Sequence, residues 1–474
     1  MIYNPKSHKA EEFISHEEIV ATMAYAAENR ANRPLIESIV ERAADGRGLS
    51  HREAALLLEC ELDDLNERMY ALAREIKQRI YGNRIVMFAP LYLSNYCVNS
   101  CTYCPYHIAN KTIPRRRLSQ SEIEAEVVAL QDMGHKRLAL EAGEHPVYNP
   151  LEYILESIRT IYSVKHRNGA IRRVNVNIAA TTVENYRRLK DAGIGTYILF
   201  QETYHKENYQ RLHPRGPKSD YAWHTEAMDR AMEAGIDDVG IGVLFGLESY
   251  RYDFVGLVMH AEHLEAACGV GPHTISVPRI CPADGVDVAD FKDAVPDEVF
   301  HKIVAVLRIA VPYTGMIIST RESAASRARA LELGVSQISG GSCTGVGGYV
   351  DGEQQEAADT AQFDVSDTRT LDEIVRWLLE LGYVPSFCTA CYREGRTGDR
   401  FMTLAKSGQI ANCCQPNALM TLKEYLMDYA SPETLRAGLK VIADELGRVP
   451  HPNVRRIAEE NLVKIENGER DFRF

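Results

Sequence analysis

Three cysteines with the spacing of metal ligands occur in the segment CVNSCTYCPYH, residues 97–107. Cys97, Cys101 and Cys104 are separated by three and by two residues, and we call them the first triad. Three thiolates can bind three irons of a 4Fe-4S cube and leave the fourth iron open, as a catalytic zinc keeps one position for a substrate. An open iron can chelate an amino acid through its amine and carboxylate. A zinc site completed by His107 is the alternative that the spacing leaves open.

A second group of three cysteines lies near the C-terminus, in CTACYREGRTGDRFMTLAKSGQIANCC. Cys388 and Cys391 are separated by two residues, and 22 residues separate Cys391 from Cys414; we call these three the second triad. Three thiolates would again leave the fourth iron of a 4Fe-4S cube without a cysteine ligand. The alternative is a zinc knot that also uses Cys413, although adjacent cysteines project in different directions and rarely bind one ion well.

The composition excludes several classes of protein. The 474-residue chain has a formal net charge of -12, which argues against a nucleic-acid-binding surface. Its N-terminus has no apolar signal region, and no run of about 18 apolar residues occurs anywhere. We therefore expect a soluble, cytoplasmic protein that binds neither membranes nor nucleic acids. We expect its eleven cysteines to be reduced in that compartment, and the clustered ones to bind metal instead of forming disulfides.

The elements that must position these cysteines follow a regular order. Residues 15–82 have the period of amphipathic helices. Strand-like and helix-like runs then alternate, which is typical of βα units around a parallel sheet. The eight strand-like runs are at residues 84–93, 135–144, 171–179, 195–204, 237–246, 272–280, 315–321 and 335–342. This pattern predicts an α/β fold, a complete (β/α)8 TIM-type barrel, with an open doubly wound sheet as the alternative.

Three regions are expected: an N-terminal helical extension (1–82), a barrel (83–382) and a C-terminal auxiliary-cluster domain (383–474). An acidic segment, 343–369, reads as a long loop. The first triad follows the first strand, so it should lie at the C-terminal mouth of the barrel. The chain after the last helix should emerge at the opposite mouth, which places the second triad roughly 20–25 Å away.

Two histidines are candidates for a further metal ligand near the second triad. His273 opens the sixth strand and should lie at the same mouth, where its imidazole could hold an extra iron. His263, on the preceding helix, is the second candidate. A structural histidine that caps a strand is the alternative for His273.

The first triad, with Tyr103 before its last cysteine, resembles the radical S-adenosylmethionine (SAM) superfamily. That resemblance implies that the open iron binds SAM and that reductive cleavage yields a 5'-deoxyadenosyl radical. Ala142-Gly143-Glu144 is similar to the element of that family that meets the SAM amino group. Gly242, in the glycine-rich fifth strand, would allow the backbone to approach the adenine. Tyr103, Gly143, Glu144, Gly242 and Glu202 are therefore expected to bind the cofactor.

Segments 200–214, 275–280 and 319–323 resemble the aromatic amino-acid lyases of this superfamily, which split tyrosine between Cα and Cβ. The thiamine-pathway 2-iminoacetate synthases belong to this group but lack a C-terminal triad. The lyases of FeFe-hydrogenase maturation have it, and resemble this chain nearly end to end. Arg279 or Arg321 is expected to clamp a carboxylate of tyrosine or SAM through a bidentate pair.

The narrower resemblance implies two 4Fe-4S clusters and a reaction in two stages. Tyrosine would give p-cresol and dehydroglycine, and dehydroglycine would become carbon monoxide and cyanide. An additional iron, attached through L-cysteine to the second cluster, would capture both as a precursor of the hydrogenase active site. The implied partners are an electron donor such as flavodoxin or ferredoxin and the other hydrogenase maturases. A non-catalytic scaffold for two metal centres is the competing hypothesis.

Overall fold

Eight parallel strands form a closed barrel in the computed structural model, which describes residues 2–350 and 360–474. The strands are β1 (Arg84–Ser94), β2 (Arg137–Ala142), β5 (Arg173–Asn177), β6 (Tyr197–Ile198), β7 (Val239–Gly242), β8 (Thr274–Ser276), β9 (Gly315–Ile318) and β10 (Gln337–Ser339). Each pairs with the next, and β10 pairs with β1 through Gln337 and Val86. The predicted (β/α)8 barrel is confirmed, and the open sheet is excluded.

Apart from β1, the strands are shorter than the strand-like runs that predicted them. The run at 195–204, for example, contributes only Tyr197–Ile198 to the sheet. Beyond β6 and β7 the chain stays largely buried but leaves the hydrogen-bonded ladder, because it turns into the loop at the mouth of the barrel. Apolar runs report burial, and burial extends past the last paired residue.

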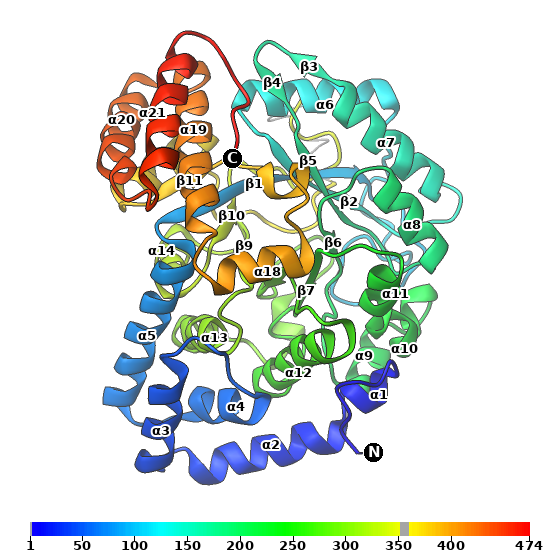
Figure 1. Ribbon diagram of the computed structural model, residues 1–474. Coiled ribbons are helices and arrows are strands. Elements are labelled where there is room, and N and C mark those ends of the chain that lie inside the picture. The colour runs from blue at the N-terminus through cyan, green and yellow to red at the C-terminus, as the bar shows by residue number, and fades with distance from the viewer. Residues whose placement is uncertain (1, 351–359) are drawn as a thin grey trace.

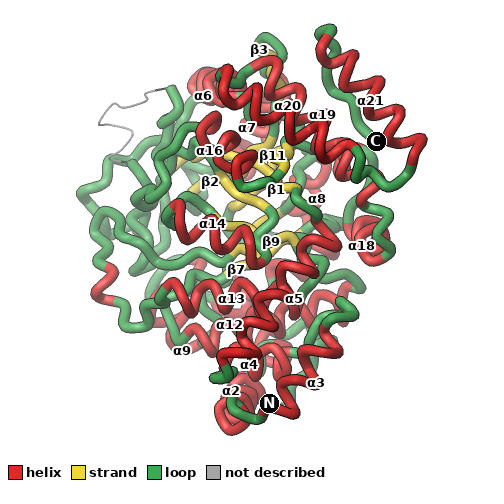
Figure 2. Tube along the Cα trace, turned by 90° about the vertical axis from the view of Figure 1, so that its left-hand side faces the viewer, coloured by secondary structure: helices red, strands yellow, loops and turns green. Residues whose placement is uncertain are grey.

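Helices cover the outside of the barrel (Figures 1 and 2). They are α6 (Gln120–Met133), α7 (Leu151–Ser163), α8 (Val183–Asp191), α9 (Lys206–Leu212), α10 (Tyr221–Thr225), α11 (Ala227–Glu233), α12 (Tyr250–Cys268), α13 (Asp297–Ala310), α14 (Ala324–Leu333) and α16 (Leu371–Glu380). Capping boxes at Ser119 and Thr370 start α6 and α16. Glu226 separates α10 from α11.

The N-terminal region is helical, as predicted. It consists of α1 (Ala10–Phe13), α2 (His16–Asn29), α3 (Arg33–Ala43), α4 (His51–Glu59) and α5 (Asp63–Tyr81). Helix α2 packs on α4 and α12, while α4 and α5 pack on α13. In Figure 1, α2, α3 and α4 lie along the lower edge of the molecule, and α5 rises along its left side.

The C-terminal segment begins with a strand that joins the barrel sheet. β11 (Val384–Ser386) runs parallel to β1, and Val86 pairs with Ser386 on one edge and Gln337 on the other. The helices that follow are α17 (Ala390–Arg393), α18 (Gly398–Lys406), α19 (Ala411–Asp428), α20 (Pro432–Leu446) and α21 (Pro452–Glu466). One continuous apolar core runs from the N-terminal helices through the barrel to α19 and α21. The three regions therefore share their core.

The remaining described elements are small. They are the hairpin of β3 (Lys165–His166) with β4 (Gly169–Ala170) and the 3-10 turns η1 (Pro217–Ser219) and η2 (Val288–Asp290). Part of the predicted acidic loop, 351–359, lies outside the described residues; 343–350 and 360–369 contain neither helix nor strand.

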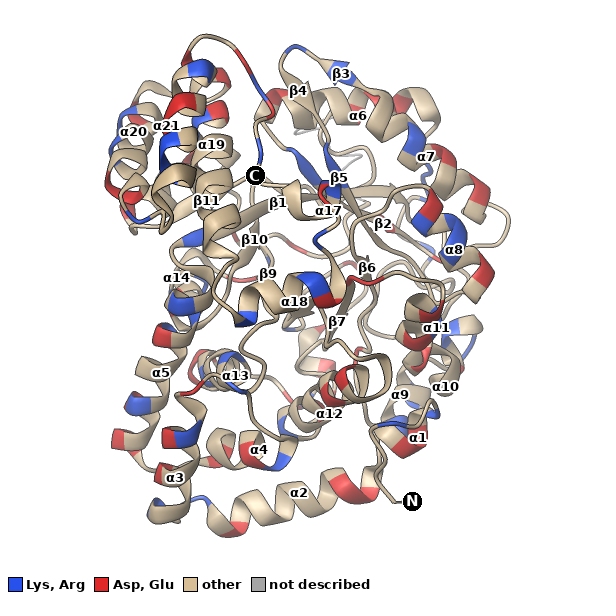
Figure 3. Ribbon diagram, viewed as in Figure 1, with Lys and Arg blue, Asp and Glu red and all other residues tan. Residues whose placement is uncertain are grey.

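The surface mixes charges of both signs. On the side shown in Figure 3, Lys and Arg are interspersed with Asp and Glu along the outer helices. Within the described part of the chain, no helix has the length and apolarity needed to cross a membrane.

Candidate functional site

The first triad lies in the loop that leaves β1 at the C-terminal mouth of the barrel, as predicted. The backbone holds this loop against the end of β2: Gly143 N donates to Ser94 O at 3.0 Å, and Val98 N donates to Glu144 O at 2.8 Å. A Cβ on Gly143 would stand 2.4 Å from the carbonyl oxygen of Tyr96. Glycine is therefore required at position 143, because any side chain would push the cysteine loop away.

All three cysteines of the first triad line one cavity, which we call the upper cavity. Their sulfurs are not gathered within 4.8 Å of one another in the described structure. A single zinc ion would hold sulfurs about 2.3 Å from the metal and so about 3.8 Å apart. His107 does not line this cavity. The fourth ligand that the zinc alternative needs therefore does not lie in the cavity with the triad.

Burial makes these thiols depend on a cation. It raises the pKa of Cys104 to about 11, and repulsion from Cys97 acts in the same direction. Burial raises the pKa of Cys101 as well. Thiolates are the form that binds iron, so the positive charge of a metal is needed to hold Cys101 and Cys104 ionised.

Glu144 and Tyr103, two of the predicted cofactor-binding residues, also line the upper cavity. Asn99 Nδ2 donates to Glu144 Oε2 at 2.6 Å and so orients the carboxyl group beside the triad. Burial raises the pKa of Glu144, although the bond from Asn99 acts against it. The hydroxyl of Tyr103 lies 2.7 Å from Nε2 of His213, so its ring is held in place.

Glu202 lines the same cavity and has an unusual backbone. Its φ is 71°, in the left-handed region that non-glycine residues rarely adopt. Its Oε1 accepts a hydrogen bond from Lys218 Nζ at 2.8 Å. Strained backbone of this kind tends to occur at functional sites, where surrounding contacts hold a side chain in a required position.

Arg321 and Glu141 form the floor of the upper cavity and also line a cavity below it, which we call the middle cavity. The Arg321 guanidinium lies 3.7 Å from the ring centre of Phe363 and 3.5 Å from Cys281 Sγ. Burial raises the pKa of Glu141 to about 8, although the charge of Arg321 opposes this shift. A cation and an acid with a perturbed pKa inside a cavity suit the binding of a polar substrate.

Arg279 and Gly242 do not line the upper cavity. The Arg279 guanidinium is bound by Glu322, by Asp297 at 2.7 Å and by the carbonyl of Val295 at 2.8 Å. Its donors are therefore already used to join loops, and of the two predicted arginines only Arg321 faces the cavity. A Cβ on Gly242 would stand 2.7 Å from the ring of Phe200, so that glycine serves close packing.

The second triad lies at the opposite mouth. Cys388, Cys391 and Cys414 line a third cavity, the lower cavity, together with residues from the N-terminal ends of the strands. Cys413 does not line it, whereas Cys414, the ligand expected from the spacing, does. Like the first triad, these cysteines do not bring three sulfurs within 4.8 Å in the described structure. His273 lines this cavity as predicted, whereas His263 does not.

The surroundings of His273 disfavour the protonated form of its imidazole. Its Nδ1 lies 3.3 Å from Asp238 Oδ1, and its ring centre lies 5.0 Å from that of Phe401 on α18. Burial lowers the pKa of His273, and the charges of Arg173 and Arg137 add to this effect against the attraction of Asp238. A neutral imidazole is the form that binds a metal.

Cationic side chains surround the second triad. The strands β1, β2 and β5 each begin with an arginine that lines the lower cavity: Arg84, Arg137 and Arg173. Arg84 Nη1 donates to Gln415 Oε1 at 3.0 Å, next to Cys414. A hydrogen bond from Cys414, together with the charge of Arg396, lowers the pKa of Cys391 to about 6 against the effect of burial. This surrounding charge offsets that of thiolates and favours an anionic cluster.

The three cavities are stacked along the barrel. The upper and middle cavities share Tyr92, Glu141, Asn177 and Arg321, and Gln337 lines both the middle and the lower cavity. A Cβ on Gly315 would stand 2.6 Å from Gln337 Nε2, so the glycine makes room for this side chain. Gln337 is therefore the residue at the boundary between the two mouths.

Several of these residues were not predicted from the sequence. Glu141 is the second-last residue of β2, directly before Ala142-Gly143-Glu144, and strand alternation could have indicated that it faces inward. The arginine at the start of three strands is a repeated signal that can be read from the sequence. Lys218 and Asn99 carry no such signal, since only the folded loops bring them to Glu202 and Glu144.

Two family models match the chain. The model described as the Radical SAM superfamily matches residues 91–258, which contain the first triad and Glu144. The model described as the Biotin and Thiamin Synthesis associated domain matches residues 276–384, which run from β8 to the start of β11.

The chain is also similar to individual proteins of known sequence or structure. The 2-iminoacetate synthase of Salmonella typhimurium (strain LT2) is 30% identical over 348 residues, which cover 73% of this chain and 89% of that protein. A crystal structure of HydG, a maturase of the [FeFe]-hydrogenase, is 55% identical with a TM-score of 0.94 and covers 98% of this chain and 100% of its own. The FeFe-hydrogenase maturase HydG from Carboxydothermus hydrogenoformans is 41% identical with a TM-score of 0.83, covering 96% of this chain and 100% of its own.

Proposed function

The chain belongs to the HydG maturases of the radical SAM superfamily, and on this basis we propose that it acts on L-tyrosine in two stages. In the first, at the upper cavity, tyrosine is cleaved between Cα and Cβ to p-cresol and dehydroglycine. In the second, at the lower cavity, dehydroglycine becomes carbon monoxide and cyanide. Both are taken up by an additional iron, held with L-cysteine, to give a precursor for the FeFe-hydrogenase.

The residues of the upper cavity support the first stage. Cys97, Cys101 and Cys104 would hold one 4Fe-4S cluster, which with SAM supplies a 5'-deoxyadenosyl radical. Glu144, oriented by Asn99, is placed to accept hydrogen bonds from the amino group of SAM. Arg321 offers a guanidinium for a carboxylate of tyrosine or SAM. Asn99 and Cys101 are buried and the other groups are half-buried, which limits the access of water to a radical formed there.

The lower cavity supports the second stage. Cys388, Cys391 and Cys414 would hold a second 4Fe-4S cluster, and His273 offers a neutral imidazole to the additional iron. Arg84, Arg137 and Arg173 supply positive charge around it. Phe401, Met402 and Ala405 of α18 contribute to an apolar cluster that packs against Cys391 and Cys414 and covers this mouth.

One observation carries the proposal: two cysteine triads lie at opposite mouths of one barrel, with stacked cavities between them that meet at Gln337. A lyase that only released its product would need the first triad alone. A second site reached through the interior of the barrel suits an intermediate that must not escape into water.

The direct test is anaerobic incubation of reconstituted protein with SAM, dithionite and tyrosine. We expect 5'-deoxyadenosine, p-cresol and carbon monoxide, and two 4Fe-4S clusters by iron and sulfide analysis. p-Cresol without carbon monoxide would favour a 2-iminoacetate synthase activity. No deoxyadenosine would favour a non-catalytic scaffold, and zinc in place of iron would contradict both cluster assignments.

We also propose the setting in which the reaction occurs. Reduction of the first cluster needs a low-potential donor such as flavodoxin or ferredoxin, and we propose that the protein works with such a donor in the cytoplasm. The product would pass to the other hydrogenase maturases. This hand-off can be tested by infrared spectroscopy, which would follow the transfer of iron-bound carbon monoxide to these maturases.

A further inference from the structure

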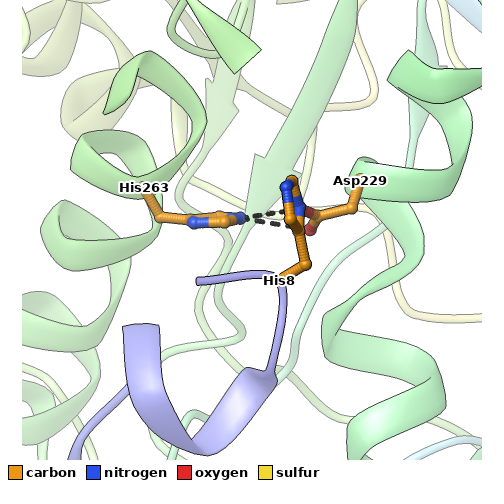
Figure 4. Close-up of side chains that lie close together, drawn as sticks. All are labelled: His8, Asp229 and His263. Atoms are coloured by element: carbon orange, nitrogen blue, oxygen red, sulfur yellow. Dashed lines mark hydrogen bonds and ion pairs between the residues drawn. The ribbon is translucent and has the colours of Figure 1, made fainter. Parts of the chain in front are cut away.

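Three potential metal ligands meet at a place that neither cysteine triad uses. His8 precedes α1, Asp229 is on α11 and His263 is on α12 (Figure 4). His8 Nδ1 lies 2.6 Å from Asp229 Oδ1. His263 Nε2 lies 3.0 and 3.1 Å from the two oxygens of Asp229. The ligand atoms of all three residues lie within 4.8 Å of one another.

The orientation of His263 exposes a lone pair to this group. Its Nδ1 lies 2.8 Å from the carbonyl oxygen of Pro5, which can only accept, so Nδ1 carries a proton. In the neutral ring Nε2 then carries a lone pair and faces a carboxylate. Two acceptors at this distance repel each other unless a cation or a second proton lies between them.

The surroundings hold His263 rigidly. Its side chain is fully buried, and its ring stacks on Phe13 with centroids 3.8 Å apart and planes 9° apart. A histidine whose second nitrogen donates to a backbone carbonyl is the usual arrangement of a metal-binding histidine, because that bond fixes its tautomer.

The adjacent cavity gives a route for a cation. It is lined by His8 and Asp229 and by four further carboxylates, with one arginine among the lining residues. The carboxylates are Glu226, Glu233, Asp237 and Asp399, and the arginine is Arg230. A cleft with an excess of negative charge concentrates cations near its walls.

We propose that His8, Asp229 and His263 bind a divalent transition-metal ion, with Zn²⁺ as the fitting class, and that this ion fastens the N-terminal segment to α11 and α12. Two imidazoles and one carboxylate suit zinc, and water from the cavity completes a tetrahedral site. The three residues are distant in the chain, so the ion closes a large loop. The site is structural and does not depend on the function proposed for the cysteine triads.

The alternative is a pair of hydrogen bonds in which protons, and no metal, join both histidines to Asp229. The two arrangements differ in what they bind. A proton-bridged group has no affinity for zinc beyond that of any exposed histidine, whereas the metal site loses its affinity when one ligand is removed.

The test uses holoenzyme with both iron-sulfur clusters reconstituted, so that the cysteines are occupied. After addition of one equivalent of Zn²⁺, zinc K-edge absorption should show nitrogen and oxygen ligands at about 2.0–2.1 Å. Equilibrium dialysis should show that His8→Ala and Asp229→Asn each weaken zinc binding by at least about tenfold. His166→Ala is the matched control, because His166 Nε2 lies 3.2 Å from Asp132 without a third ligand.

A second measurement keeps the proposal testable if a variant is poorly folded. Zn²⁺ should slow hydrogen exchange in the peptide spanning residues 2–13 of the wild type, and should not do so in His8→Ala, whose exposed side chain can be removed without disturbing the core. Equal zinc affinity in wild type and His8→Ala, or sulfur ligands at the zinc edge, would overturn the proposal.

Discussion

The guanidinium of Arg137, at the first residue of β2, donates a hydrogen bond from Nη2 to the carbonyl oxygen of Cys388 over 2.7 Å. A barrel strand thus holds the loop that carries the second triad. Because Arg137 lines the lower cavity, the same side chain also supplies positive charge beside the cysteines. The barrel and the C-terminal segment are therefore coupled at the point where the second cluster is proposed.

Replacing Arg137 with methionine should weaken the second site selectively. The change removes a charge-assisted hydrogen bond, which contributes about 1.5–3 kcal/mol, and makes the cluster harder to reduce. We expect p-cresol to persist while carbon monoxide per p-cresol falls and the potential of the second cluster becomes more negative. Redox titration followed by electron paramagnetic resonance measures the potential. The control Arg188→Met removes an exposed ion pair with Glu152, and it should change neither the ratio of carbon monoxide to p-cresol nor the cluster potential.

The two stages should separate when the second triad is removed. Cys388→Ser combined with Cys391→Ser leaves the upper cavity intact, because these residues line the other mouth. This variant should form deoxyadenosine and p-cresol and lose most of its carbon monoxide, with iron content falling to one cluster. If p-cresol disappears as completely as it should in Cys97→Ser, the two sites are not independent.

His273→Ala should have a narrower effect than loss of the triad. The imidazole lines the lower cavity, but the three cysteines remain to hold the cluster. We expect p-cresol formation to be unchanged and the additional iron to be retained poorly, which metal analysis after gel filtration would measure. Full retention of that iron would exclude His273 as its ligand.

A larger side chain at position 337 should obstruct the passage of dehydroglycine from the upper and middle cavities to the lower cavity. Phenylalanine at this position is larger, and Gly315 leaves space only for the existing side chain. Gln337→Phe should keep both clusters and p-cresol formation while the ratio of carbon monoxide to p-cresol falls. Gln337→Met, of similar size, serves as the control and should retain a ratio closer to the wild type. Equal ratios in all three proteins would indicate another route.

Arg321 and Arg279 should respond differently to replacement by lysine. Arg321 faces the upper cavity, so Arg321→Lys should raise the apparent KM for tyrosine or SAM by about tenfold, equivalent to about 1.4 kcal/mol. Arg279→Lys should instead lower the melting temperature with little change in KM, because Arg279 joins Glu322 and Asp297. A raised KM in Arg279→Lys alone would reverse the assignment.

Sequence and structure agree most closely where chemistry is local. The place of the first triad in the loop after a strand predicted its position at the C-terminal mouth. The 22-residue spacing favoured Cys414, which lines the lower cavity, over its neighbour Cys413, which does not. The alternation of strands and helices predicted a barrel, and the order of its helices then placed the second triad and His273 at the opposite mouth. These features follow from chain order, so a linear sequence contains them.

The tertiary structure decided what depends on packing between distant segments. Arg279 and Arg321 both follow a strand, and only their neighbours show that one is held by carboxylates while the other faces a cavity. Lys218 meets Glu202, and Arg137 meets Cys388, through contacts that no local pattern encodes. His8, Asp229 and His263 likewise meet only because α11 and α12 pack side by side with the N-terminal segment across them. The direction of a side chain and the pairing of buried charges are set in the folded core, because packing and hydrogen bonding there involve segments from the whole chain.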